Sequence, residues 1–336
     1  MHPRDLPWPG REWLSGDVPL GVDEAKLSMA LDLIFTGGME AQAGATQAFV
    51  VVHRGLIVVE RYGEAISRAK TLKSWSLAKS FLNAVVGTLV EKEFLQLDGP
   101  LGLVEWAGKS DFRSAITVRH LLNMSSGLDF NEDHGDRHSD SGEMLWGKGA
   151  QDMGAFAMER PLVRRPGSHF RYSSGDSLIL STVVKRVLEE NQLSTLDWMQ
   201  EHILDPLGMT SAIPRFDPSG TFIGSSYLFA CAQDFARLGY LYLRGGHWND
   251  CTLLTESWVN FSRTPSPAGA EAGYGAHFWL TKGSHGLFFG DGFEGQKILI
   301  DPTIDLVVVR LGKTDEEQHP SLQRALALTV SAFSGL

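Results

Sequence analysis

The chain has 336 residues, of which 43% are hydrophobic and 21% are charged, and its formal net charge is -10. This length and composition are typical of a globular protein with one large domain or two interleaved domains and a full buried core. The negative net charge argues against a surface that binds nucleic acid.

The two cysteines, Cys231 and Cys251, are too few and too isolated for a disulfide framework or a zinc site. This usage fits a reducing compartment. The N-terminal segment lacks the apolar core of a secretion signal, and no later run approaches the length of a membrane span. We therefore expect a cytoplasmic protein with neither nucleic acid nor a membrane as partner.

The first seventy residues predict a helix followed by a β-hairpin. Residues 1–22 are rich in proline, and a helical stripe of apolar residues then begins after Asp23. Two apolar segments, 48–53 and 56–62, lie on either side of an Arg54-Gly55 dipeptide. This arrangement is typical of two antiparallel strands joined by a tight turn.

The segment 74–94, SWSLAKSFLNAVVGTLVEKEF, predicts a buried helix, because its apolar residues recur at three- and four-residue spacing and extend almost all round it. Ser76 lies at the start of this helix and Lys79 one turn later, on the same face. A buried lysine is costly without a role. Desolvation lowers the pKa of such an amine, so Lys79 is a candidate base for the Ser76 hydroxyl, which is a poor nucleophile unaided.

Two observations weaken this hypothesis when the spacing is taken alone. A serine that caps the helix, followed by a lysine that reaches the surface, would produce the same pattern. Ser67 and Lys70 also have this spacing, although they lie in a polar stretch without helical periodicity. We treat the second pair as a chance match.

The middle of the chain is predicted to be mainly helical. Thr117 is a candidate N-cap of a short helix that ends near Gly127, and amphipathic helices are expected at 176–190 and 233–243.

The segment 131–140, between these helices, is almost wholly polar and contains His134 and His138 among acidic residues. A surface loop explains this composition, and no third ligand stands at a helical spacing, so we expect no metal site and no cofactor.

A second candidate for chemistry is Tyr172, which lies in the segment 165–177, RPGSHFRYSSGDS, in a predicted loop just before a helix. Taken alone, it would be read as a core tyrosine. Beside a Ser-x-x-Lys helix, however, a phenol can pass the proton from the base to the leaving group. We therefore predict a proton relay between Lys79 and Tyr172.

From residue 274 onward the hydrophobic period becomes two, which is typical of strands. Strands are expected at 274–280, 287–289, 297–300 and 306–311, turns at Lys282-Gly283 and Asp301-Pro302, and a last helix at 321–333.

Strands at both ends of the chain, with helices between them, predict an α/β (α+β) fold. An antiparallel sheet flanked by terminal helices would be formed by residues 1–72 and 268–336. A mostly helical region, residues 73–267, would be inserted, with the active site between the two parts.

On these residues the chain resembles the serine β-lactamase and penicillin-recognising superfamily, in particular its class C-like esterases, D-amino-acid peptidases and 6-aminohexanoate-oligomer hydrolases. The resemblance covers most of the chain and is carried by Ser76-Leu77-Ala78-Lys79, Tyr172-Ser173-Ser174 and the segments 116–130, 205–212, 225–246 and 292–309. It implies a β-lactamase/transpeptidase-like fold and an acyl-enzyme on Ser76, with Lys79 and Tyr172 shuttling protons. The implied substrate is a small-molecule ester or amide.

Two positions depart from the family pattern. Ser174 stands where class C enzymes have an asparagine, and a hydroxyl does not supply the paired donor and acceptor of an amide. The third motif has Gly290-Asp291-Gly292 in place of a Lys- or His-containing triplet. A different alignment with the family would place the last glycine of this motif at Gly295. The glycines leave room for the backbone N–H of Phe293 to form an oxyanion hole with that of Ser76.

If Gly290 and Gly292 face the site, the third motif offers no charge to a substrate; if Asp291 does, it repels an anion. We therefore predict an esterase or amidase for modest-sized, uncharged acyl groups, with poor activity on β-lactam antibiotics.

Two further functions stay open: an acyltransferase that uses the same acyl-enzyme, and a non-catalytic binding protein with this fold. An α/β-hydrolase is excluded because no Gly-x-Ser-x-Gly motif occurs.

Overall fold

The computed structural model describes residues 2–108, 110–281 and 286–336. The helices are α1 Glu24–Phe35, α2 Leu77–Glu91, α3 Val118–Leu122, α4 Asp140–Trp146, α5 Met153–Met158, α6 Ser174–Glu190, α7 Thr195–Met199, α8 Asp205–Leu207, α9 Ala232–Leu243, α10 Glu256–Ser262 and α11 His319–Phe333. The strands are β1 Ala45–His53, β2 Leu56–Tyr62, β3 Leu72–Lys73, β4 Ile213–Pro214, β5 Leu228–Ala230, β6 His247–Trp248, β7 Cys251–Thr252, β8 Trp279–Leu280, β9 Phe288–Gly292, β10 Gln296–Asp301 and β11 Leu306–Lys313.

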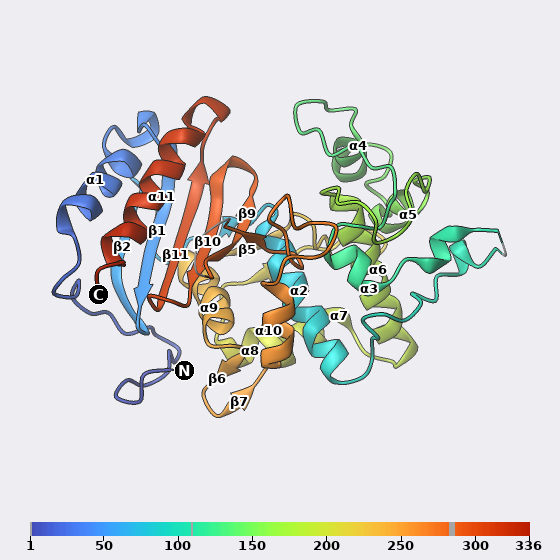
Figure 1. The fold of residues 1–336 in the computed structure, drawn as a ribbon, viewed down its shortest axis with the longest axis horizontal. Helices are drawn as coiled ribbons and strands as arrows, with labels where there is room; N and C mark the ends of the chain where they lie inside the picture. Colours follow the sequence, from blue (N-terminus) through green and yellow to red (C-terminus); the bar gives the residue numbers. More distant parts are fainter. Residues whose placement is uncertain (1, 109, 282–285) are drawn as a thin grey trace.

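The main sheet has six antiparallel strands in the order β2-β1-β11-β10-β9-β8, so strands from both ends of the chain lie side by side in it (Figure 1). Strand β1 pairs with β11, with Val51 opposite Val308. Arg54 and Gly55 join β1 to β2 with φ values of 51° and 92°, as a two-residue hairpin turn with left-handed backbone requires. The predicted fold class is confirmed.

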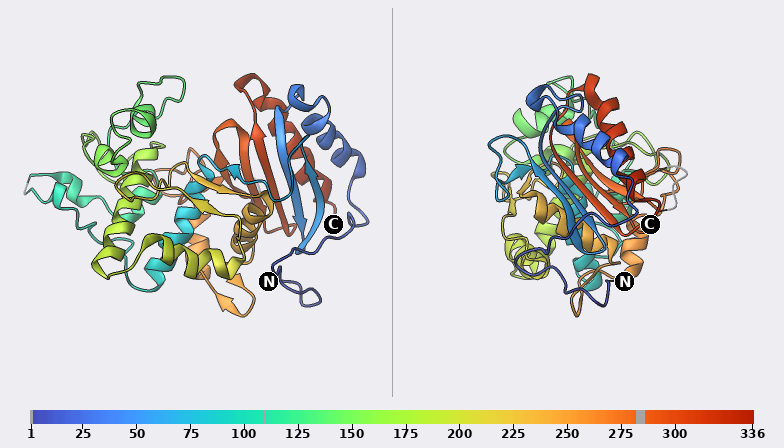
Figure 2. Two further views of the ribbon diagram at one scale, coloured as in Figure 1. Left: turned by 180° about the vertical axis from the view of Figure 1, so that it is seen from behind. Right: turned by 90° about the vertical axis from the view of Figure 1, so that its left-hand side faces the viewer.

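Both faces of the sheet are buried. Helices α1 and α11 cover one face (Figure 2). Phe49 and Val51 of β1 share a buried hydrophobic cluster with residues of these two helices. Helix α9 packs on the other face. A Cβ on its Gly239 would lie 2.8 Å from side-chain atoms of both Ile298 and Val307, so this glycine allows the helix to approach the strands closely.

Helix α2 runs between the sheet and the helices α3, α5 and α6 (Figure 1), and its residues from Leu77 to Leu89 are all buried. This burial agrees with its nearly continuous apolar surface. In the short sheet β3-β5-β4, strand β3 lies just before α2 in the chain and pairs with β5. The sheet therefore joins the start of α2 to the segment after residue 210.

The C-terminal strands differ in part from the prediction. The expected strand 274–280 is reduced to β8, because His277 has a φ of 57°, which interrupts an extended backbone. The predicted Lys282-Gly283 turn lies outside the described residues. The boundaries of the two parts, 1–72 with 268–336 and 73–267, stay a prediction.

Over the described ranges, no helix is long and apolar enough to span a membrane.

Candidate active site

Ser76 directly precedes the first residue of α2 and is partly exposed. Although it occupies the N-cap position, its hydroxyl makes no capping hydrogen bond to the described residues of the helix. Lys79 is 1% exposed and therefore does not reach the surface. The alternative of a capping serine and a surface-seeking lysine does not describe this pair.

The Lys79 amine lies 3.0 Å from the Ser76 hydroxyl oxygen. Its other hydrogen bonds are to the hydroxyl of Ser174, at 3.1 Å, and to the backbone carbonyl of Ser225, at 2.9 Å. Burial lowers the pKa of this amine to about 8, and the negative charge of Glu132 opposes this shift. Near pH 7 part of the Lys79 population is therefore uncharged, and the uncharged amine can accept a proton.

Tyr172 lies two residues before α6, and the Lys79 Nζ atom is 4.8 Å from the centre of its ring. Burial raises the pKa of the phenol, while a side-chain hydrogen bond with Ser76 acts in the opposite direction. The phenol therefore stays protonated at neutral pH. It stacks on Trp279 at a ring distance of 5.6 Å, so strand β8 holds its orientation.

Glu132 also belongs to this cluster, although sequence analysis placed it in a surface loop. Its two carboxylate oxygens accept hydrogen bonds from the backbone N–H of Ser174, at 2.7 Å, and from its hydroxyl, at 2.5 Å. The Glu132 side chain is only 14% exposed. No periodicity in the segment 131–140 marks this residue as turned inward, so its polarity alone was misleading.

The third predicted motif lies on β9, beside the start of α2. A Cβ on Gly290 would lie 3.0 Å from atoms of Leu77 and Ser80, so the glycines face α2. Asp291 faces the other way and forms an ion pair with Lys297 at 2.6 Å. Of the two orientations considered, the structure therefore has the one in which this strand offers the site no charge.

Two residues with left-handed backbone connect α2 to the end of β9. Trp75 has a φ of 45° and Glu294 a φ of 62°, both unusual for bulky side chains. The Trp75 indole N–H donates to the Glu294 carboxylate at 2.9 Å. Since Ser76 follows Trp75 and Phe293 precedes Glu294, this bond ties together the two backbone segments whose N–H groups were predicted to form an oxyanion hole.

Helices α2 and α6 are held together by His277, which is buried. One ring nitrogen contacts the Lys79 carbonyl oxygen at 2.9 Å, and the other contacts the Ser177 hydroxyl at 3.2 Å. Burial lowers the pKa of this imidazole to about 3, so it is neutral and fixes the backbone of Lys79 without adding charge to the site.

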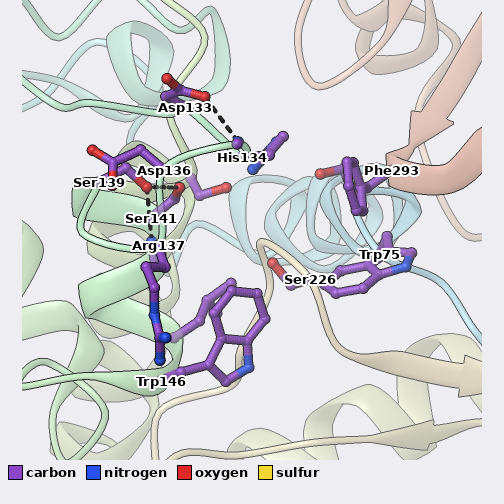
Figure 3. A pocket seen from close by; sticks show the side chains of 15 residues that line it. Trp75, Asp133, His134, Asp136, Arg137, Ser139, Ser141, Trp146, Ser226 and Phe293 are labelled. Carbon is purple, nitrogen blue, oxygen red and sulfur yellow. Dashed lines mark hydrogen bonds between the residues drawn. The ribbon is translucent and has the colours of Figure 1, made fainter. Parts of the chain in front are cut away.

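A pocket of about 160 Å³ opens at Ser76 and Ser174. Figure 3 shows Trp75 and Phe293 on one side of it and the loop that precedes α4, with Trp146, on the other. Its walls therefore combine three aromatic side chains with polar residues, and the acidic residues Asp133 and Asp136 line the loop side.

The two histidines of that loop lie near different carboxylates. His134 lies 3.8 Å from Glu132, and His138 lies 3.3 Å from Glu143. In the part of the chain that the structure describes, no group of three or more His, Cys, Asp or Glu side chains is placed to hold a metal ion.

Residues 31–331 match the family model described as Beta-lactamase. A 6-aminohexanoate-dimer hydrolase from Paenarthrobacter ureafaciens is 25% identical over 312 residues, which are 85% of this chain and 78% of that protein.

Solved structures show the same fold. The Bacillus anthracis protein named "Putative 6-aminohexanoate-dimer hydrolase" superposes with a TM-score of 0.75 at 22% identity, covering 97% of this chain and 90% of its own. A penicillin binding protein from Bacillus halodurans superposes with a TM-score of 0.69 at 18% identity, covering 88% and 98%.

Proposed function

Because the chain belongs to the β-lactamase family and is a hydrolase of that family, we propose that it cleaves an ester or amide bond through an acyl-enzyme on Ser76. The observation that carries the proposal is the 3.0 Å contact between the Ser76 hydroxyl and the buried Lys79 amine. A nucleophile and a base at this distance are the minimum that such a reaction needs.

In the proposed reaction, the neutral Lys79 amine takes the Ser76 proton while the Ser76 oxygen attacks the substrate carbonyl carbon. The backbone N–H groups of Ser76 and Phe293 stabilise the oxyanion. The Tyr172 phenol passes the proton to the leaving group, which departs and leaves Ser76 acylated. Water then attacks the ester, and the same groups return the proton to Ser76. Transfer to another acceptor would differ only in this last step.

The walls of the pocket favour an uncharged acyl group of modest size. Trp75, Phe293 and Trp146 offer apolar contact. Gly290 and Gly292 place no cation beside the scissile bond, where a β-lactam antibiotic carries its carboxylate. Arg137 also lines the pocket, but it lies on the loop opposite β9, with Asp133 and Asp136. We therefore expect esters and simple amides to react better than β-lactams.

The test has two parts. A fluorophosphonate probe followed by peptide mapping should label Ser76 alone, and a label on another serine would contradict the assignment. The second part compares kcat/KM for p-nitrophenyl acetate and butyrate, the linear dimer of 6-aminohexanoate, and nitrocefin. A clear preference for nitrocefin would show that the substrate class is wrong while leaving the nucleophile in place.

A further inference from the structure

We infer that Glu132 is a positioning residue that fixes the direction of the Ser174 hydroxyl and thereby aims the lone pair of the Lys79 amine at Ser76. The inference rests on the proposed function, because it concerns how that reaction's base is oriented. It follows from the number of hydrogen-bond donors and acceptors around Lys79.

The Ser174 hydroxyl has a single hydrogen to donate. Glu132 is acceptor-only when ionised, and it takes this hydrogen at 2.5 Å while its second oxygen takes the Ser174 backbone N–H at 2.7 Å. Ser174 is 2% exposed, so bulk water has little access to the hydroxyl. Toward Lys79, the Ser174 oxygen can therefore only accept.

The Lys79 amine contacts three oxygens, those of Ser76, Ser174 and Ser225. The Ser225 carbonyl, at 2.9 Å, can also only accept. A charged ammonium satisfies both of these oxygens and donates its third hydrogen to Ser76. A neutral amine has two hydrogens and one lone pair. Its hydrogens stay on Ser174 and Ser225, so the lone pair points to Ser76, which is the one contact of the three that can reverse its direction.

The arrangement therefore prepares the base before it is deprotonated. Lys79 need not rotate when it loses its proton, since the two fixed acceptors hold the other hydrogens in place. Without Glu132, the Ser174 hydroxyl could turn and donate to the neutral amine, and the lone pair would then be directed at Ser174 rather than at the nucleophile. Loss of this orientation should lower the reaction rate far more than it lowers the stability of the fold.

The test is the rate of fluorophosphonate labelling of Ser76 as a function of pH, because it measures activation of the nucleophile without a known substrate. Glu132→Gln keeps the shape of the side chain but offers one acceptor oxygen where the carboxylate offers two. We expect the plateau rate to fall by up to about 100-fold. We also expect the rising limb of the profile to move to lower pH, because the charge that opposed the shift of the Lys79 pKa is gone.

Glu159→Gln is the matched control, since it removes an exposed carboxylate from the same helical region. Ser174→Ala provides a second route, because it removes the hydroxyl while Glu132 keeps its charge. If Glu132 acts through Ser174, the double variant should reach nearly the same plateau as Ser174→Ala alone. Circular dichroism and thermal unfolding check that each variant is folded.

Two results would overturn the inference: an unchanged pH limb in Glu132→Gln, or plateau losses that simply multiply in the double variant. Either would show that Glu132 only holds the start of α6. Absence of labelling at Ser76 in the unmodified protein would instead contradict the proposed function, and with it this inference.

Discussion

The chain contains two Ser-x-x-Lys pairs with identical spacing and opposite surroundings. Ser67 and Lys70 are both exposed and belong to a turn in which the Lys70 N–H donates to the Ser67 carbonyl at 3.0 Å. Ser76 and Lys79 stand at the start of a buried helix, with the amine hydrogen-bonded to three oxygens. The comparison shows that the motif acquires its chemistry from desolvation and from the groups around it, and that spacing contributes only proximity.

The strongest test of this comparison is to remove each serine hydroxyl in turn. Ser76→Ala should lower kcat on p-nitrophenyl esters by on the order of a millionfold, because removal of the nucleophile disables the whole catalytic unit. Ser67→Ala should retain normal turnover. Initial rates of the two purified variants provide the measurement, and substantial activity in Ser76→Ala would refute the difference drawn between the pairs.

The two lysines provide the second test. Only the neutral form of Lys79 is a base, so kcat/KM should rise with pH through about 8, the pKa that burial imposes on it. In Lys79→Met the rising limb of the pH profile should disappear, and the rate should fall by roughly 10²- to 10⁴-fold, as expected when a general base is removed. Lys70→Met should retain the full profile. A profile with no rise between about pH 7 and pH 9, about one unit on either side of that pKa, would argue against Lys79 as the base.

A third test concerns strand β9, which lies beside the start of α2. A Cβ on Gly292 would lie 2.6 Å from the Ser74 backbone oxygen, which cannot move away without moving the start of α2. Gly292→Ala should displace the Phe293 N–H and lower kcat by about 10²- to 10³-fold, the usual loss for an oxyanion donor. Gly290→Ala is the comparison variant.

The Gly290 Cβ would meet side-chain atoms of Leu77 and Ser80 at 3.0 Å, and side chains can give way more easily than backbone. Its effect on kcat should therefore be smaller. Equal losses in the two variants would mean that crowding of β9 in general, and not the position of one N–H group, limits the reaction.

Local sequence patterns predicted those parts of the fold that local interactions determine. The hairpin at Arg54-Gly55, the buried helix α2 and the Thr117 cap all follow from residues close together in the chain. The predicted roles of Ser76, Lys79, Tyr172, Ser174, Gly292 and Phe293 stay predictions until the variants are measured.

What the sequence did not reveal depends on contacts between distant segments. Glu132 turns inward because Ser174, 42 positions later, offers it two donors. The strand predicted at 274–280 is interrupted because His277 is drawn to the backbone of Lys79. Neither effect leaves a periodic signal near the residue itself, so a single sequence contains no local clue to either.

The pairing of β1 with β11 also bears on how the protein is made. Roughly 250 residues separate these strands, so at about 5–20 residues per second a ribosome needs roughly 10 to 50 s to deliver the partner of β1. During that interval the Ala48–Val52 segment, apolar and without its central neighbour, is exposed to other nascent chains. Chaperone binding to this segment during synthesis is therefore expected to raise the yield of folded protein.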